Sequence, residues 1–190
     1  MAYASLDDLT QYLGIDDSTA DDGKLTQFLA RAQAAIDNET RRVFEVSADS
    51  TRWHDAGSVQ ERTLFLDGDC CAITSITNGN GATVAASEYY TLPRNRTPYY
   101  ALELYSDSTV AWVDGGRSGG QIAVTGKWGY SLTAPADVVQ ATVRLAAWFY
   151  RQKDNAAGDQ AIVTGDVTVL PARLPEDVRK LLWPYLRVLV

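Results

Sequence analysis

The chain has 190 residues, of which 46% are hydrophobic and 22% charged, a composition typical of a globular protein and unlike that of a disordered chain. Its formal net charge of −7 argues against broad phosphate or nucleic-acid binding, which usually requires a basic face. No apolar run approaches the ~20 residues that a membrane span needs, and Met1 leads into a polar segment without a signal-peptide pattern, so we expect a protein made and kept in a cytoplasm, with no membrane partner.

Two helices are expected at the N-terminus. Ser5, followed by acidic residues, and Gly14, which is a natural stop, predict a short helix over residues 5–13. Apolar residues then repeat at helical spacing from Leu25 to Phe44 and predict a long amphipathic second helix. Its other face is polar and charged, which is the usual pattern of a solvated surface.

The middle of the chain has the pattern of a β-rich insert. Short β-branched and aromatic runs, separated by turn residues, predict strands at 63–66, 72–77, 89–92, 99–105 and 121–128. Asn78-Gly79-Asn80-Gly81 predicts a hairpin turn, because asparagine and glycine tolerate positive φ. The glycine-rich residues 115–120 predict a second, flexible connection.

Residues 134–154 predict the central helix of the protein. Pro135 suits a first helical turn, and apolar side chains cover most of the helix circumference. A helix of this kind must be covered on more than one side. The remaining polar stripe includes Arg144 and Arg151, which are candidates for contacts with acidic residues of a neighbouring subunit.

The C-terminal part predicts a small hairpin over residues 162–169 and a last helix that starts at Pro175. Pro184 is expected to end or kink this helix. The residues beyond it are too apolar for a freely solvated terminus, so we expect them to dock on another surface. The candidate docking residues are Trp183, Tyr185, Leu186, Arg187, Val188 and Val190.

Together these elements predict an α+β protein, in which a small α-helical bundle made from the N- and C-terminal helices is interrupted by a β-rich insert. The helical domain would comprise residues 1–45 and 134–190, and the inserted β-rich module residues 46–133.

No segment carries a strong catalytic or metal-binding signature. The single histidine, His54, lies beside Asp55 without a nucleophile motif and is interpreted as a strand-edge residue. Asp67-Gly68-Asp69 resembles a fragment of a calcium loop but lacks the remaining ligands, and it is interpreted as a turn. The adjacent Cys70 and Cys71 have no second ligand pair. We therefore expect no enzyme, no cofactor and no metal site.

Several segments, taken in order, carry a family resemblance: YASLDDLTQYLGI, FLARAQAAIDNETRRVF, VTGKWGYS, PADVVQATVRLAAWFYRQKD and LPEDVRKLLWPYLRVLV. They resemble the head-tail connector (adaptor, or head-completion) proteins of tailed bacteriophages, and the resemblance covers nearly the whole chain. The long β insert and the hairpin at residues 162–169 depart from the mainly helical members of that family.

The resemblance implies a non-enzymatic structural protein of the virion neck, assembled in the bacterial host cytoplasm. A homo-oligomeric ring, a dodecamer, would join the portal vertex to the tail after DNA packaging. Its partners would be the portal protein, a tail-side stopper or tail-terminator protein, and genomic DNA that passes without specific binding. The C-terminal candidate residues would then bind the portal.

An acidic surplus bears on how DNA would pass. The aspartates concerned are Asp7, Asp8, Asp16, Asp17, Asp21 and Asp22. Many assembled copies would concentrate negative charge around an axis, so we expect a channel that is net negative or neutral and does not hold phosphates. Equally open is that these residues only cap helices and solubilise the outer surface.

Two other functions remain open. Aromatic residues in the insert are compatible with a carbohydrate- or surface-binding β module on a helical stem, although cross-strand packing is their commoner use. These residues are Tyr89, Tyr90, Tyr99, Tyr100, Trp112 and Trp128. The third alternative is a hydrolase that uses His54 and Asp55.

Overall fold

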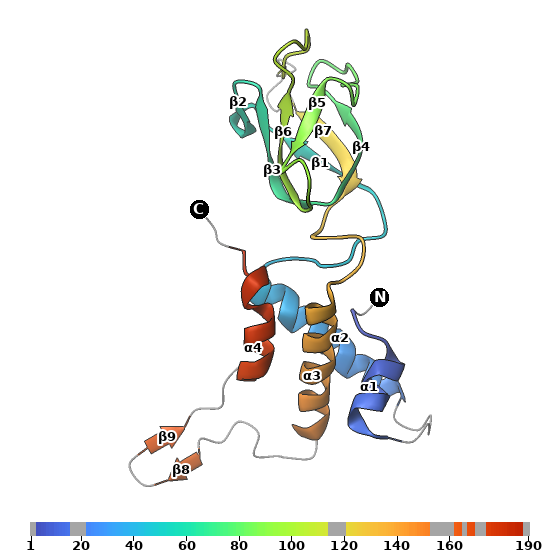
Figure 1. Cartoon of the computed structure of the whole chain (residues 1–190), viewed down its shortest axis with the longest axis vertical. Coiled ribbons are helices and arrows are strands. Elements are labelled where there is room, and N and C mark those ends of the chain that lie inside the picture. The colour runs from blue at the N-terminus through green and yellow to red at the C-terminus, as the bar shows by residue number, and fades with distance from the viewer. Residues whose placement is uncertain are drawn as a thin grey trace. The chain divides into compact units, whose positions relative to one another are not determined.

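The computed structural model describes residues 3–15, 22–113, 121–152, 162–164, 167–169 and 174–187. Within these ranges the chain forms four α-helices and nine β-strands, with helices at both ends and strands in the middle (Figure 1). The expected α+β class is therefore confirmed. The elements group into two compact units, Met1–Arg42 with Ala134–Val190, and Val43–Thr133.

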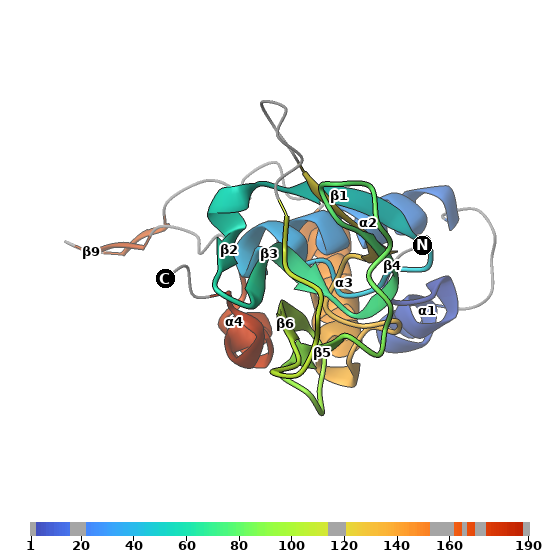
Figure 2. The same ribbon diagram turned by 90° about the horizontal axis from the view of Figure 1, so that it is seen from above.

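The first unit is helical. Its helices are α1 (Leu6–Leu13), α2 (Asp22–Thr40), α3 (Ala136–Gln152) and α4 (Glu176–Leu182), and a short 3-10 turn, η3 (Trp183–Tyr185), follows α4. Helix α3 packs against each of the other three helices. It lies between α1 and α4 in both views of the ribbon (Figures 1 and 2). This arrangement matches the prediction that the segment forms a central helix.

Helix α1 starts and ends where its local sequence predicts. The Ser5 hydroxyl accepts a hydrogen bond from the backbone N–H of Asp8 (3.1 Å), and the Asp8 carboxylate accepts one from the Ser5 backbone N–H (2.9 Å). This reciprocal pair is a capping box. Gly14 closes the helix at a left-handed φ of 66°, a conformation that costs glycine little.

Helix α2 ends at Thr40, so the prediction that it continues to Phe44 is wrong. The chain turns out of the helix at Arg41, which has a φ of 57°. Phe44 is fully buried in the second unit, where its ring packs 5.4 Å from the ring of Tyr130. Its apolar side chain fits the helical spacing, but tertiary burial decides which unit contains it.

The second unit is built from antiparallel strands. They are β1 (Ser50–His54), β2 (Val59–Gln60), β3 (Thr63–Cys70), β4 (Ala72–Thr77), β5 (Tyr89–Leu92), β6 (Tyr99–Leu104) and β7 (Ile122–Lys127), with the short 3-10 helix η2 (Ala56–Ser58) between β1 and β2. A three-stranded sheet has the order β1-β7-β4, and a four-stranded sheet the order β2-β3-β6-β5. Both sheets contribute to one hydrophobic core, which includes Leu64, Leu102 and Val124. The five predicted strands are confirmed in position, whereas β1 and β2 were not among them.

Two local predictions in this unit have different outcomes. Asp67-Gly68-Asp69 lies inside β3 and not in a turn, which corrects the interpretation from sequence. The pairing of β3 with β6 shifts register between Phe65 and Cys70, so a bulge accommodates these polar residues within the strand. The turn after β4 is present, since Gly81 donates to the carbonyl of Asn78 (2.8 Å) and Thr77 bridges to Thr83.

The C-terminal elements also follow the prediction. Strands β8 (Ile162–Thr164) and β9 (Val167–Val169) pair antiparallel as a hairpin. Helix α4 begins directly after Pro175, and Pro184 lies in η3, where the α-helix has ended. The turn at residues 165–166 and the glycine-rich residues 115–120 lie outside the described residues. None of the helices described here is long and apolar enough to span a bilayer.

Replacement of Leu145 by alanine tests the central role of α3. Leu145 is fully buried, so its truncation should lower the free energy of unfolding by about 2–5 kcal/mol. Leu132→Ala is the matched control, because Leu132 is 56% exposed and its loss should change stability by no more than about 0.5 kcal/mol. Denaturant unfolding followed by far-UV circular dichroism measures both. Equal effects of the two substitutions would contradict the proposed core.

Candidate functional site

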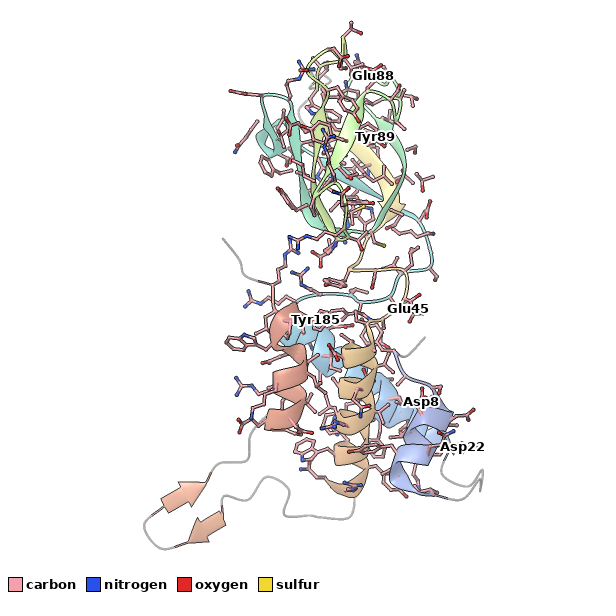
Figure 3. The ribbon with its side chains drawn as sticks, viewed as in Figure 1. Asp8, Asp22, Glu45, Glu88, Tyr89 and Tyr185 are labelled. Atoms are coloured by element: carbon pink, nitrogen blue, oxygen red, sulfur yellow. The ribbon has the colours of Figure 1, made fainter. Side chains whose placement is uncertain are left out.

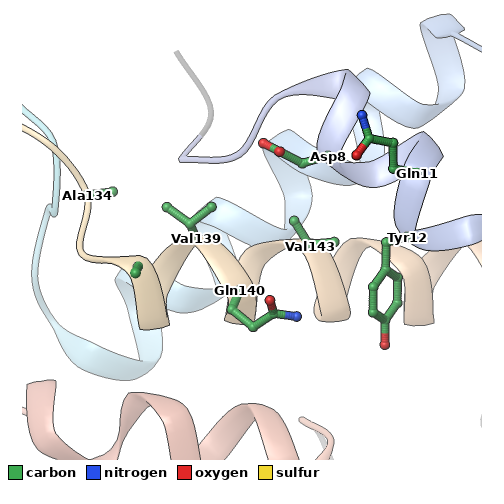
Figure 4. A pocket seen from close by; sticks show the side chains of 8 residues that line it. Asp8, Gln11, Tyr12, Ala134, Val139, Gln140 and Val143 are labelled. Carbon is green, nitrogen blue, oxygen red and sulfur yellow. The ribbon is translucent and has the colours of Figure 1, made fainter.

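The helical unit has a groove between α1 and α3, with a volume of about 640 Å³. It is lined by Asp8, Gln11, Tyr12, Ala134, Ala136, Val139, Gln140 and Val143 (Figure 4). Val139 and Val143 lie one turn apart on α3 and form an apolar floor. Gln11 and Gln140 are exposed, and Tyr12 is 43% exposed, so the rim is polar and accessible.

Asp8 places one carboxylate on the α1 side of this groove, and the neighbouring Asp7 lies outside the lining. Asp7 and Asp8 are both exposed in the first turn of α1, and this helix contains no lysine or arginine. Hydrogen bonds from Ser5 hold the pKa of Asp8 below its usual value, which keeps this carboxylate ionised. Of the other predicted acidic residues, Asp22 lies in the first turn of α2. Asp16, Asp17 and Asp21 lie outside the described residues.

The exposed side of α4 has a different character. Leu174, Glu176, Arg179, Lys180 and Trp183 line a hollow of about 460 Å³. Trp183 is 73% exposed, more than any other large hydrophobic side chain in the described part of the chain. Lys180 Nζ lies 3.1 Å from Glu176 Oε1, a largely exposed pair of the kind that adds little stability. This side therefore presents an aromatic ring, the guanidinium of Arg179 and the Lys180–Glu176 ion pair.

The two arginines predicted for subunit contacts differ in their surroundings. Arg144 Nη1 lies 2.8 Å from Asp177 Oδ2, so α3 is joined to α4 of the same chain. This hydrogen bond holds the pKa of Asp177 below its usual value. Arg151 lies about two turns further along the same face of α3 and is exposed. Arg151 is accordingly the more accessible of the two for a neighbouring subunit.

Part of the C-terminal segment docks on the helical unit itself. The Tyr185 carbonyl accepts a hydrogen bond from Arg42 Nε (2.8 Å), and the Tyr185 hydroxyl donates to Asp137 Oδ2 (3.3 Å). The Arg187 backbone N–H donates to the carbonyl of Thr40 at the end of α2 (3.1 Å). Figure 3 shows Tyr185 beside the helix ends that it joins.

The remaining residues of the predicted portal-binding set are less constrained. Leu186 is half-buried, and Trp183 projects from the end of α4. Val188 and Val190 lie outside the described residues. Tyr185 and Arg187 thus form contacts within their own chain, so part of the predicted portal-binding segment is already bound to the helical unit.

Of the residues considered for catalysis or metal binding, His54 and the two cysteines are buried, whereas Asp55 and Asp67 are exposed. His54 is 1% exposed at the end of β1, where its ring lies 5.7 Å from that of Trp128. Its Nε2 atom has no hydrogen-bond partner among the described residues, and burial lowers its pKa. Burial raises the pKa of the Cys70 thiol to about 11, so at neutral pH this group is a protonated, weak nucleophile and metal ligand. The described ranges hold no group of three or more His, Cys, Asp or Glu residues placed to bind a metal ion.

Most of the aromatic residues proposed for a sugar platform are used in packing. Trp128 belongs to the core of the second unit, and Tyr89, Tyr99 and Trp112 pack against it. The ring of Tyr90 lies 5.1 Å from that of Tyr105 and is covered by Arg94, whose guanidinium carbon lies 3.7 Å from the ring centroid. Tyr100 is 55% exposed. The six residues therefore do not form one exposed aromatic surface.

Solved structures with a similar fold come from gene transfer agent (GTA) particles. A chain in the neck of an empty GTA particle computed with C6 symmetry aligns with a TM-score of 0.60 and 18% identity, over 97% of this chain and 89% of that chain. A chain in the virion of a native GTA particle aligns with a TM-score of 0.58 and 21% identity, over 97% of this chain and 89% of that chain. A chain in the neck of a native GTA particle computed with C12 symmetry aligns with a TM-score of 0.55 and 20% identity, over 88% of this chain and 84% of that chain.

These likenesses establish a shared fold along nearly the whole chain. Their origin in the neck or virion of GTA particles agrees with the resemblance to head-tail connector proteins. No family model and no curated protein matches the sequence.

His54 allows a test of the second unit by pH titration, because it is the single histidine in the chain. Its midpoint, measured by NMR of the ring protons, should lie below the usual 6.5, since burial disfavours the imidazolium. Asp67 and Asp55 partly offset this effect, whereas Arg52 adds to it.

The stability of the fold should follow the same titration. Below about pH 6.5 the unfolded chain binds a proton at His54 that the folded chain takes up only at lower pH, so stability falls as the pH drops through that interval. His54→Gln should remove this part of the pH dependence. A midpoint at or above 6.5 in the folded protein would contradict the buried, neutral state.

Proposed function

We propose that this chain is a structural protein of the neck of a phage-like particle, in which copies form a ring between the portal vertex and the tail. The observation that carries the proposal is the likeness of fold, over 97% of the chain, to a chain from a GTA particle neck. The C6 and C12 symmetries of two of these particle necks support a ring of many copies, and we propose a dodecamer. The ring would assemble in the host cytoplasm and remain in the neck of the virion.

The proposed role requires assembly and no catalysis. In the described part of the chain, His54 and the two cysteines are buried, so substrates have little access to them. The helical unit instead exposes a groove with an apolar floor and a separate hollow beside a tryptophan. These are features of surfaces that bind other macromolecules.

Three contacts follow from this role. Arg151, and Arg144 if its pair with Asp177 rearranges, would meet acidic residues of the neighbouring subunit. The end of the chain would contact the portal protein, and the opposite side of the ring a stopper or tail-terminator protein. Genomic DNA would pass through the ring without specific binding.

The carbohydrate-binding alternative is less well supported. A sugar platform needs exposed aromatic faces, but Tyr89, Tyr99, Trp112 and Trp128 are packed on the core of the second unit. We therefore retain the neck protein as the proposed function.

Co-expression with the portal protein of the same particle tests the proposed function. The full chain should co-purify with the portal and form closed rings that electron microscopy can count. Failure to bind the portal, together with failure to form any closed assembly, would overturn the proposal.

Deletion of residues 188–190 tests the contact with the portal. This truncation keeps the hydrogen bonds of Tyr185 and Arg187 to the helical unit, so the unfolding curve should stay unchanged while portal attachment is lost. Deletion from Tyr185 onward is the comparison, and it should also lower stability because those hydrogen bonds disappear. Normal attachment by the chain that lacks residues 188–190 would show that the portal contact lies elsewhere.

The passage of DNA leads to a separate prediction. The chain is acidic overall, with a formal charge of −7, so the free protein should show no appreciable affinity for linear duplex DNA at physiological salt. A fluorescence anisotropy titration repeated at several salt concentrations measures this, and a basic DNA-binding domain serves as the positive control. Tight binding that weakens steeply with added salt would indicate a DNA clamp and contradict a passive channel.

A further inference from the structure

We propose that the exposed side of α4 in one copy docks into the α1–α3 groove of the next copy, with Trp183 as the anchor. This inference rests on the proposed function, because it specifies which surfaces of the helical unit join neighbouring copies. The partner is a second copy of this chain.

The first argument is the placement of the two surfaces. Helix α3 lies between α1 and α4 (Figures 1 and 2), so α1 and α4 form opposite edges of the helical unit. The groove is lined from α1 and α3, and Trp183 directly follows α4. A contact between two different surfaces is heterologous and can be repeated from copy to copy. Repetition of such a contact closes into a ring when the rotation between copies allows it.

The second argument is the shape and polarity of the surfaces. The groove has a volume of about 640 Å³ and an apolar floor formed by Val139 and Val143. Trp183 is 73% exposed, and tryptophan is one of the residue types enriched at the energetic centres of protein interfaces. An aromatic side chain of this kind buries about 150–250 Å² on docking. The groove therefore offers room and apolar contact for the indole side chain of Trp183.

The third argument is charge. Asp7 and Asp8 lie on the α1 edge, whereas Arg179 lies beside Trp183 on the α4 edge. Lys180 lines the same hollow but is paired with Glu176, so Arg179 supplies the unpaired positive charge of this edge. Within the described residues, neither the Asp7 carboxylate nor the Arg179 guanidinium forms an ion pair. Opposite charges attract the α4 edge of one copy to the α1 edge of the next, while two α1 edges repel each other. Charge thus gives the contact a direction.

This assignment moves Trp183 from the portal-binding set to the contact between copies. It also accommodates Arg151, which lies on the face of α3 that carries Arg144 and its α4 partner Asp177. Arg151 would add a further cation to the edge that meets the acidic edge of the neighbour.

Disulfide cross-linking of the full chain tests the contact directly. A variant with both Gln11→Cys and Lys180→Cys places one thiol on each of the two surfaces. After mild oxidation it should form a ladder of dimers, trimers and larger species on a non-reducing gel, and reduction should collapse the ladder. Either single variant should form no ladder, and wild type should remain uncross-linked because Cys70 and Cys71 are buried.

Substitution of the anchor and of the charges then tests the mechanism in the double-cysteine background. Trp183→Ala should weaken association about tenfold or more, as loss of an interface anchor does. Trp53→Ala is the matched control, since Trp53 is 61% exposed but lies on β1. Arg179→Glu should reduce the ladder, and the addition of Asp7→Lys should restore it. Asp8 is left unchanged because it caps α1.

Each outcome decides the assignment. Four results would overturn this docking contact while leaving the proposed function intact. The double-cysteine variant could form rings without a ladder, or the single variants could form ladders equal to its own. Trp183→Ala and Trp53→Ala could have equal effects, or Asp7→Lys could fail to rescue Arg179→Glu. A Trp183→Ala chain that forms normal rings but fails to bind the portal would return Trp183 to the portal contact. The inference and the proposed function would both be overturned if, with the portal present, neither wild type nor the double-cysteine variant formed rings and the double-cysteine variant formed no ladder.

Discussion

The fold of the helical unit depends on the burial of α3. This helix is apolar around most of its circumference, and residues such as Val138, Ala141 and Leu145 are fully buried. One neighbouring helix cannot cover such a surface, so α1, α2 and α4 are all required. The N- and C-terminal parts of the chain must therefore come together around one element, although the whole β unit separates α2 from α3 in the sequence.

Coverage of α3 from several sides also explains what stays exposed. Helices α1 and α4 are short, and each uses one face against α3, so their other faces remain available. On the α1 side this leaves a groove with valines at its floor, and on the α4 side an exposed tryptophan beside cations. The same packing thus produces a stable core and two unlike edges, which is the property that a repeating, directional assembly needs.

The chemistry of the β unit fits a structural role. Its single histidine and both cysteines are buried, and most of its large aromatic side chains are committed to the core or to one another. Three cations of this unit also have partners. Arg52 forms an ion pair with Asp67, Lys127 forms one with Asp49, and Arg94 lies over the ring of Tyr90. These interactions consolidate the sheets of this unit.

Local sequence determined the features that depend on near neighbours. The Ser5 cap, the Gly14 stop and the start of α4 at Pro175 are contacts or backbone preferences within one turn, so their residues predict them directly. The same holds for the apolar period of α3 and for most strands, because burial of a helix face or sheet face leaves a regular pattern. The fold class and the central helix could therefore be predicted from the sequence.

Tertiary structure alone decided the features that depend on distant residues. Phe44 fits the period of α2, yet packing against Tyr130 draws it into the β unit and ends the helix at Thr40. The local sequence around Asp67 predicts a turn, but the pairing of β3 with β6 places this residue in a bulged strand. The partner of Arg144 and the groove between α1 and α3 also arise only when separate segments meet. Such contacts have no local signature, because their free energy comes from residues far away in the sequence.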